Sequence, residues 1–245
     1  MNNIFSFERF VKVLKYDLKF RVPGIRTMFL AFLLLPHAWR WIFDLSGPFS
    51  TAGRIEFIGT ILTCLLFFAP FSIYSSFRDK HGTGSFLMLP ASSLEKFASM
   101  VLVSLFILPL AFCLGSYIVD SVFVLLFKSN YLEFIPISQI MAAADMVHYS
   151  ELLFLLVGAA LFGNVLFKKR ASAKTILCLL ALAFLWGSVI TEILFSEIFS
   201  FRDLDPTILQ TKTDRVAVIT EFVLVGVSVL LYCLAFWRLK KIQIS

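Results

Sequence analysis

The chain has 245 residues, of which 59% are hydrophobic and only 16% are charged, and 29 of them are phenylalanine. A soluble domain is usually about 45–50% apolar and about 25% charged, so this composition argues against a water-soluble protein. The net charge of +6 does not indicate nucleic-acid binding, because the basic residues are spread between apolar runs. This distribution is typical of a polytopic membrane protein in contact with a lipid bilayer.

Residues 4–20 predict an amphipathic helix at the start of the chain. Apolar side chains recur along one helical face, and the basic side chains lie largely elsewhere on the helix. Such a helix lies in the headgroup plane of a membrane, beside anionic lipid. We place this interfacial helix within residues 1–24, where Pro23 and Gly24 end it. Its site residues are Phe7, Arg9, Lys12 and Lys15.

Residues 25–245 predict a single transmembrane domain of six helices in an all-α fold. A hydrocarbon core about 30 Å thick needs about 20 helical residues, and six apolar runs reach about that length. Residues 118–137 are interpreted as the outer end of the third span followed by a short surface helix or a further half-span. Residues 200–215 are interpreted as a polar connection. The predicted spans cover about residues 25–43, 55–77, 94–117, 140–167, 175–199 and 216–237.

The segment between the second and third spans combines charges, glycines and a helix start. Its charges are those of the RDKH text at residues 78–81. Ser92 and Glu95 have the spacing of a capping box, in which each side chain accepts a hydrogen bond from the backbone N–H of the other residue. Pro90 disfavours helix at Leu89 and marks a turn. We therefore predict a turn, a sharp break and a new helix that enters the membrane.

The positions of lysine and arginine predict that both termini are cytoplasmic. With six spans and a cytoplasmic N-terminus, sixteen of the 22 lysines and arginines fall on the cytoplasmic side. This bias is the property that sets the orientation of membrane proteins. The charged segment between spans two and three then faces the cytoplasm as well.

The sequence carries no motif for nucleotide binding or for covalent catalysis. The GxxxxGK[ST] loop that cradles nucleotide phosphates is absent, and so are the HExxH and GxSxG motifs. We therefore predict that this chain is not an enzyme and holds no cofactor of its own.

Asp145, His148 and Glu151 form a weak candidate for a metal site. Residues three apart are neighbours on a helix, and two carboxylates with an imidazole can bind a divalent metal or relay protons. The three residues fall near the predicted outer end of the fourth span. A hydrated outer mouth is therefore the favoured interpretation, and we predict no metal.

The order of these elements resembles that of the membrane subunit of type-2 ABC transporters. An interfacial helix is followed by two spans, a charged cytoplasmic turn and four further spans. The text LPASSLEKF at residues 89–97 also looks like a recurring feature of ABC-2-type permease-like proteins from Bacteroidetes. The resemblance implies an exporter in the bacterial cytoplasmic (inner) membrane. Two membrane subunits, in the simplest case a homodimer, would bind two ATPase subunits that carry ATP and Mg.

The resemblance also implies which parts of the chain couple to the ATPase subunits. The interfacial helix at Phe5–Phe20 and the turn at about Phe77–Met88 would contact them and transmit their closure. The coupling residues that the resemblance implies are Phe77, Arg78, Asp79, Lys80, His81 and Phe86.

A partner-independent membrane protein is the alternative function. It would be a secondary carrier that uses the Asp145, His148 and Glu151 cluster, or a scaffold or immunity-type protein. A carrier needs buried, paired charges within the membrane, whereas most acidic residues of this chain fall near the predicted span ends.

Overall fold

The computed structural model describes residues 5–42, 50–75, 90–128, 131, 133–143, 150–198 and 206–244. The regular elements in these ranges are all helices, which confirms the predicted all-α fold class. In chain order they are α1 (Phe7–Tyr16), the π-helix η1 (Asp17–Arg21), the 3-10 helix η2 (Val22–Ile25), α2 (Arg26–Ile42), α3 (Thr51–Ile73), α5 (Ser93–Leu102), the π-helix η4 (Val103–Ile107), α6 (Leu108–Leu126), α7 (Ile137–Ala143), α8 (Ser150–Leu166), α9 (Ala171–Ile198) and α10 (Pro206–Ile244).

Within these ranges, four helical stretches are long and apolar enough to cross a membrane. They are Thr51–Ile73, Ser93–Leu126, Ala171–Val189 and Val218–Lys241. The first and fourth predicted spans correspond instead to α2 and α8, which have 17 residues each. At 1.5 Å per residue such a helix is about 25 Å long, shorter than a hydrocarbon core of about 30 Å. The long apolar helices indicate a membrane protein, and the number of six spans stays a prediction.

The third predicted span is longer than the sequence analysis expected. Helices α5, η4 and α6 continue from Ser93 to Leu126, so residues 118–126 extend the span and form no separate surface helix. Asp120 lies inside this continuous helix, although a lone carboxylate is unfavourable in lipid. Asp120 is buried and paired with Arg54, so its charge does not oblige the helix to end.

Two further boundaries differ from the prediction. We predicted residues 200–215 as a polar connection, and α10 begins at Pro206, so the part of this connection from residue 206 onward is helical. Proline is tolerated at the first position of a helix because the N–H that it lacks would have no intrahelical acceptor there. The fourth predicted span, residues 140–167, contains the separate helices α7 and α8, and residues 144–149 lie outside the described part of the chain.

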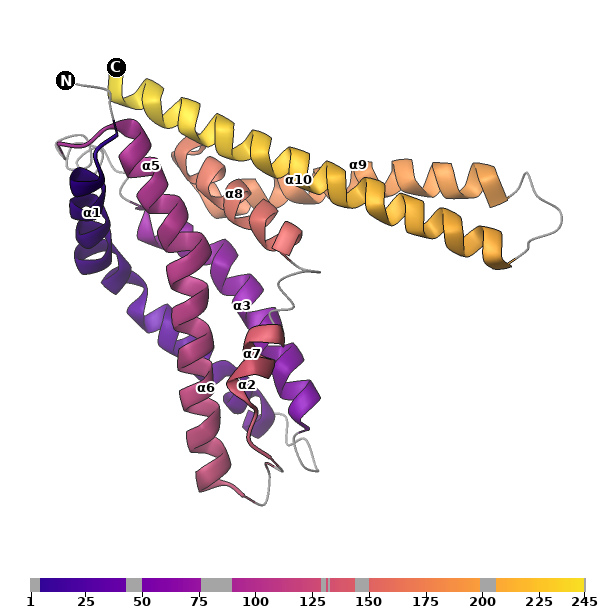
Figure 1. Ribbon diagram of the computed structural model, residues 1–245, viewed down its shortest axis with the longest axis horizontal. Coiled ribbons are helices and arrows are strands. Elements are labelled where there is room, and N and C mark those ends of the chain that lie inside the picture. Colours follow the sequence, from indigo (N-terminus) through magenta and orange to yellow (C-terminus); the bar gives the residue numbers. More distant parts are fainter. Residues whose placement is uncertain are drawn as a thin grey trace.

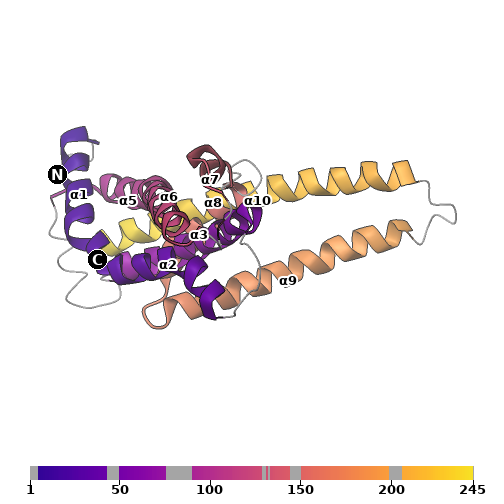
Figure 2. The same ribbon diagram turned by 90° about the horizontal axis from the view of Figure 1, so that it is seen from below.

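The helices form a bundle from which one pair extends sideways. Helices α2, α3, α5, α6 and α7 run through the bundle, and α1 lies beside α5 at the end where both termini are found (Figure 1). Helix α8 packs between α3 and α10. Helices α9 and α10 both continue beyond the bundle in the same direction (Figures 1 and 2).

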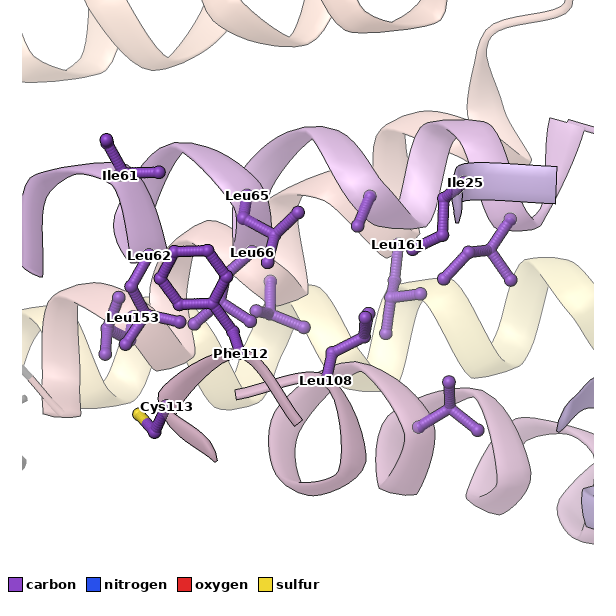
Figure 3. Packing of buried hydrophobic residues seen from close by; sticks show 14 of the residues in the cluster. Ile25, Ile61, Leu62, Leu65, Leu66, Leu108, Phe112, Cys113, Leu153 and Leu161 are labelled. Atoms are coloured by element: carbon purple, nitrogen blue, oxygen red, sulfur yellow. The ribbon is translucent and has the colours of Figure 1, made fainter. Parts of the chain in front are cut away.

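Helix α3 lies at the centre of the hydrophobic core. Its N-terminus is capped by Ser50, whose hydroxyl accepts a 3.2 Å hydrogen bond from the Gly53 backbone N–H. Apolar side chains on several faces of α3 are buried, because α2, α6, α7 and α8 all pack against it. The largest cluster includes Ile61, Leu62, Leu65, Leu66, Leu108, Phe112, Leu153 and Leu161 (Figure 3).

Two glycines of α8 allow the neighbouring helices to approach closely. A Cβ atom added at Gly158 would lie 2.9 Å from Cε2 of Tyr232 on α10. A Cβ atom added at Gly163 would overlap the Thr175 hydroxyl on α9, which donates to the Ala171 carbonyl and is held in place. Glycine at these positions lets α9 and α10 pack directly on the α8 backbone, as small residues do in membrane helix pairs.

The first prediction concerns this close contact. Gly163→Ala should destabilise the protein by about 1–3 kcal/mol, because the added methyl group overpacks the contact with Thr175. Thermal unfolding in detergent measures the effect. Gly24→Ala is the control, because a Cβ there meets nothing within 4 Å. Equal midpoints for the two variants would contradict the close α8–α9 packing.

Candidate functional site

The side chain of Glu95 joins the N-terminal ends of α5 and α1. Its Oε2 accepts a 2.8 Å hydrogen bond from the Ser92 backbone N–H, and the Glu95 N–H donates to the Ser92 hydroxyl at 3.2 Å, which confirms the predicted capping box. Its Oε1 accepts from the backbone N–H of Ser6 at 2.8 Å and from the Arg9 guanidinium, whose Nη2 lies 3.1 Å away. One buried carboxylate thus satisfies backbone donors at the start of two helices.

Asp17 makes a second link between the first helical segment and α5. Its side chain is fully buried, and it accepts hydrogen bonds from Arg21 Nη1 at 2.9 Å and from the Ser99 hydroxyl at 2.6 Å. Burial raises the pKa of Asp17, and the Arg21 guanidinium and the Ser99 hydroxyl act in the opposite direction. The segment that follows α1 is therefore held to α5 by an ion pair and a charged hydrogen bond away from water.

Arg21 extends this contact to the end of α3. Its guanidinium lies 5.7 Å from the ring centroid of Tyr74, the residue directly after α3, and 5.5 Å from that of Tyr16. Tyr74 precedes the predicted coupling turn, and Ser92 follows it. The residues on both sides of that turn therefore contact the first helical segment. Tyr74, before the turn, contacts Arg21, and Glu95, after the turn, contacts Ser6 and Arg9. We call the set Ser6, Arg9, Asp17, Arg21, Tyr74, Ser92, Glu95 and Ser99 the junction.

The predicted coupling residues themselves lie outside the described residues. These are Phe77, Arg78, Asp79, Lys80, His81 and Phe86.

The structure divides the predicted interfacial residues between two roles. Phe7 is 71% exposed, and Lys12 and Lys15 are exposed as well. Lys12 forms a 2.6 Å ion pair with Glu8, which lowers the pKa of that exposed carboxyl group. Arg9, in contrast, pairs with the buried Glu95 and so anchors the helix.

A second buried polar cluster lies near the start of α3 and the end of α6. Nη1 of Arg54 donates to both carboxylate oxygens of Asp120, each at 2.8 Å. The other terminal nitrogen of Arg54 donates to the Glu133 backbone carbonyl. Both charged side chains are almost completely buried, so the pair is shielded from water. This cluster and the junction lie at opposite ends of the bundle (Figure 1).

Aromatic residues surround this ion pair, and through His37 they connect α2 to the cluster. The Tyr131 ring centroid lies 5.4 Å from the Arg54 guanidinium carbon, and the Tyr131 hydroxyl is 3.0 Å from Nδ1 of His37. The His37 ring stacks on Phe123 at a centroid distance of 4.1 Å. The cluster thus holds α2, α3, α6, Tyr131 and Glu133 together at one end of the bundle.

Sequence reasoning did not find this pairing. The sequence analysis singled out neither Arg54 nor Asp120 as a site residue. The two residues are 66 positions apart, and no local motif joins them. The available signal was a charged residue in an otherwise apolar helix, which in membrane proteins usually has a charged partner.

The candidate metal residues are only partly placed. Glu151 lies in the first turn of α8 and is partly buried, whereas Asp145 and His148 lie outside the described residues. Among the residues that the structure describes, no group of three or more histidine, cysteine, aspartate or glutamate side chains is arranged to hold a metal ion.

No protein-family model matches the chain, and no curated protein or solved structure matches it either. The resemblance to ABC-2 permeases therefore stays a prediction that rests on the order of the predicted elements and on the text at residues 89–97.

The second prediction tests Glu95. Glu95→Ala removes the acceptor of the Ser6 and Ser92 N–H groups, and each buried donor left unsatisfied costs about 1–3 kcal/mol. Hydrogen–deuterium exchange in nanodiscs should therefore be about tenfold faster or more across residues 7–16. Glu8→Ala is the control. It removes a solvent-exposed glutamate from α1, the helix whose exchange is measured. Unchanged protection of α1 in Glu95→Ala would refute this anchoring role.

The third prediction tests the Arg54–Asp120 pair. Asp120→Leu should destabilise the protein by about 3–5 kcal/mol, because it leaves a buried guanidinium without a countercharge. The double variant Arg54→Met/Asp120→Leu should recover most of that loss, because no charge is then buried. Denaturation midpoints in detergent give both values. A double variant as unstable as the single one would show that the charge imbalance is not the cause.

Proposed function

We propose that this chain is the membrane subunit of a type-2 ABC transporter. It works as an exporter in the bacterial cytoplasmic membrane, with both termini inside, and a separate ATPase subunit binds ATP and Mg. The observation that carries the proposal is the junction. Its two buried carboxylates, Glu95 and Asp17, tie the interfacial helix to α5 beside both described flanks of the charged turn.

The junction supports the proposal because it connects the turn rigidly to both α1 and α5. The sequence contains no nucleotide-binding motif, so the work of transport must come from a partner or from an ion gradient. A partner that pushes the predicted turn at about Phe77–Met88 acts at once on Tyr74 and Ser92, which lie on either side of it. Because Arg21 and Glu95 contact the same interfacial segment, that force moves α1 and α5 together.

The long helix Ser93–Leu126 can transmit a movement of the junction to the other end of the bundle. Glu95 and Ser99 hold its beginning to the α1 segment, and Asp120 holds its far part to Arg54 on α3. Between these anchors lies the π-helix η4, which is followed by Pro109. π-Helical turns and prolines interrupt the regular hydrogen-bond ladder, and kinks form at such places. In the proposed mechanism, this helix bends at residues 103–109.

A secondary carrier is the second candidate, and one observation favours it. Arg54 and Asp120 are buried, paired charges within helices of membrane-spanning length, which is the arrangement that ion-coupled carriers use. The double variant Arg54→Met/Asp120→Leu separates the two functions. A carrier that depends on the pair loses ion-driven transport in this variant, whereas an ATP-driven subunit keeps stimulated ATP hydrolysis.

The fourth prediction tests coupling directly. Alanine at Arg78, Asp79 and Lys80 should reduce stimulated ATP hydrolysis and export about tenfold, while membrane insertion stays normal. The assay uses the chain reconstituted with an ABC ATPase encoded by a neighbouring reading frame. Alanine at Lys168, Lys169 and Arg170 is the matched control, because these residues form another charged turn on the predicted cytoplasmic side. Normal coupling in the first triple variant would count against the proposed function.

A further inference from the structure

We propose that the exposed side of α6 is a lipid-facing wall, which contacts the acyl chains of the bilayer from about Phe106 to Leu126. This wall marks which part of the long helix Ser93–Leu126 lies in the hydrocarbon core. It does so with or without an ATPase partner, since the evidence for it comes from the length, exposure and composition of the helix.

The helix formed by α5, η4 and α6 is longer than the hydrocarbon core of a bilayer is thick. It has 34 residues, which corresponds to about 50 Å at about 1.5 Å per residue. Even at a tilt of about 40°, the largest that is usual, it would extend about 39 Å along the membrane normal. Because the core is about 30 Å thick, part of this helix must lie outside it.

Exposure divides the helix into a covered and an uncovered part. Within Ser93–Leu105, all of which the structure describes, the one exposed side chain is that of Leu94, because α1 and α10 pack on α5. From Phe106 onward, large apolar side chains are exposed at steps of three or four residues, so they follow one side of the helix. They are Phe106, Leu110, Leu114, Tyr117, Ile118, Val122, Leu125 and Leu126.

The polar side chains of α6 lie on its buried side. Ser116 is 4% exposed and Asp120 is 2% exposed, and the carboxylate of Asp120 is paired with Arg54. No charged side chain is exposed between Phe106 and Leu126, a stretch that is described throughout. A helix with polar groups inside and large apolar side chains outside is suited to lipid and not to water.

Acyl chains fit this side of α6 better than another protein does. Helices that pack together in a membrane use small residues, which let their backbones approach. Among the exposed positions from Phe106 to Leu126 only Ala111 is small. The single glycine of α6, Gly115, is covered within the chain, because a Cβ atom there would lie 3.1 Å from Cδ1 of Leu33 on α2. The exposed side is therefore bulky and has no notch for a neighbouring helix.

The length and the far end of the exposed side match the hydrocarbon core. Phe106 and Leu126 are about 20 residues apart, or about 30 Å along the helix, which equals the thickness of the core. Directly beyond Leu126, Phe127 packs edge-on against Trp41, with ring centroids 5.1 Å apart. Trp41 is 55% exposed, and Lys128 is exposed as well. Tryptophan and lysine at the end of an apolar stretch are typical of the membrane–water interface.

At the near end, the junction falls outside the hydrocarbon core. Glu95 precedes Phe106 by about three helical turns, or about 16 Å. The buried carboxylate of Glu95 and the start of α5 then lie at the level of the lipid headgroups or beyond. The covered part of the long helix is thus the part that leaves the core, and α1 packs on it there.

The fifth prediction uses spin labels on single cysteines in the full chain in nanodiscs, with the four native cysteines replaced by alanine. Labels at Leu110 and Ile118 should collide with oxygen, which dissolves in acyl chains, and rarely with a water-soluble nickel chelate. Leu94 and Lys128 are the controls, because they are exposed on either side of the wall. The ratio of oxygen to nickel collisions should be at least about tenfold higher at Leu110 and Ile118, because hydrocarbon excludes polar molecules at least this strongly.

Three results would overturn the inference. Low collision rates with both reagents at Leu110 and Ile118 would show that protein covers this side of α6. Frequent collisions with the nickel chelate at these positions would show that it faces water. A ratio at Leu94 as high as that at Leu110 would place α5 in the core and contradict the proposed boundary. The measurement needs no ATPase, so its outcome is separate from that of the coupling test in the fourth prediction.

Discussion

The buried carboxylate of Glu95 is the interaction on which the rest of the structure depends. A charge removed from water is tolerated only when hydrogen bonds and an opposite charge compensate it. Glu95 obtains this compensation from two backbone N–H groups, of Ser6 and Ser92, and from Arg9. The same contacts fix where α1 and α5 begin and hold the two helices together. The position of α1 relative to α5 is therefore set by the hydrogen bonds and the ion pair that compensate one buried side chain.

At the opposite end of the bundle, a different pair of residues compensates buried charge. Arg54 and Asp120 compensate each other, and the Glu133 carbonyl accepts a further hydrogen bond from Arg54. Because α5, η4 and α6 are continuous, one long helix is anchored by buried charges near both of its ends. Its anchors lie on different partners, the α1 segment and α3. A push on one anchor therefore strains the helix between them, where the π-helix η4 interrupts the regular ladder.

The sequence predicted the features that depend on local spacing. The capping box of Ser92 and Glu95 spans four residues, so its pattern is visible in the chain, and the amphipathic helix is visible for the same reason. The contact between Arg9 and Glu95 spans 86 positions and was not predictable, because only the folded chain brings them together. The pairing of Arg54 with Asp120 spans 66 positions and was not predictable for the same reason. The order of elements gave the transporter proposal, which the geometry supports but does not test.

The central claim is that α1 and α5 move as one body against α6. Electron paramagnetic resonance measures this directly, with spin labels at the exposed positions Phe7, Leu94 and Ile118 and with the proposed ATPase partner added. The account predicts that ATP leaves the Phe7–Leu94 distance unchanged and alters the Leu94–Ile118 distance. A changed Phe7–Leu94 distance together with a constant Leu94–Ile118 distance would contradict it.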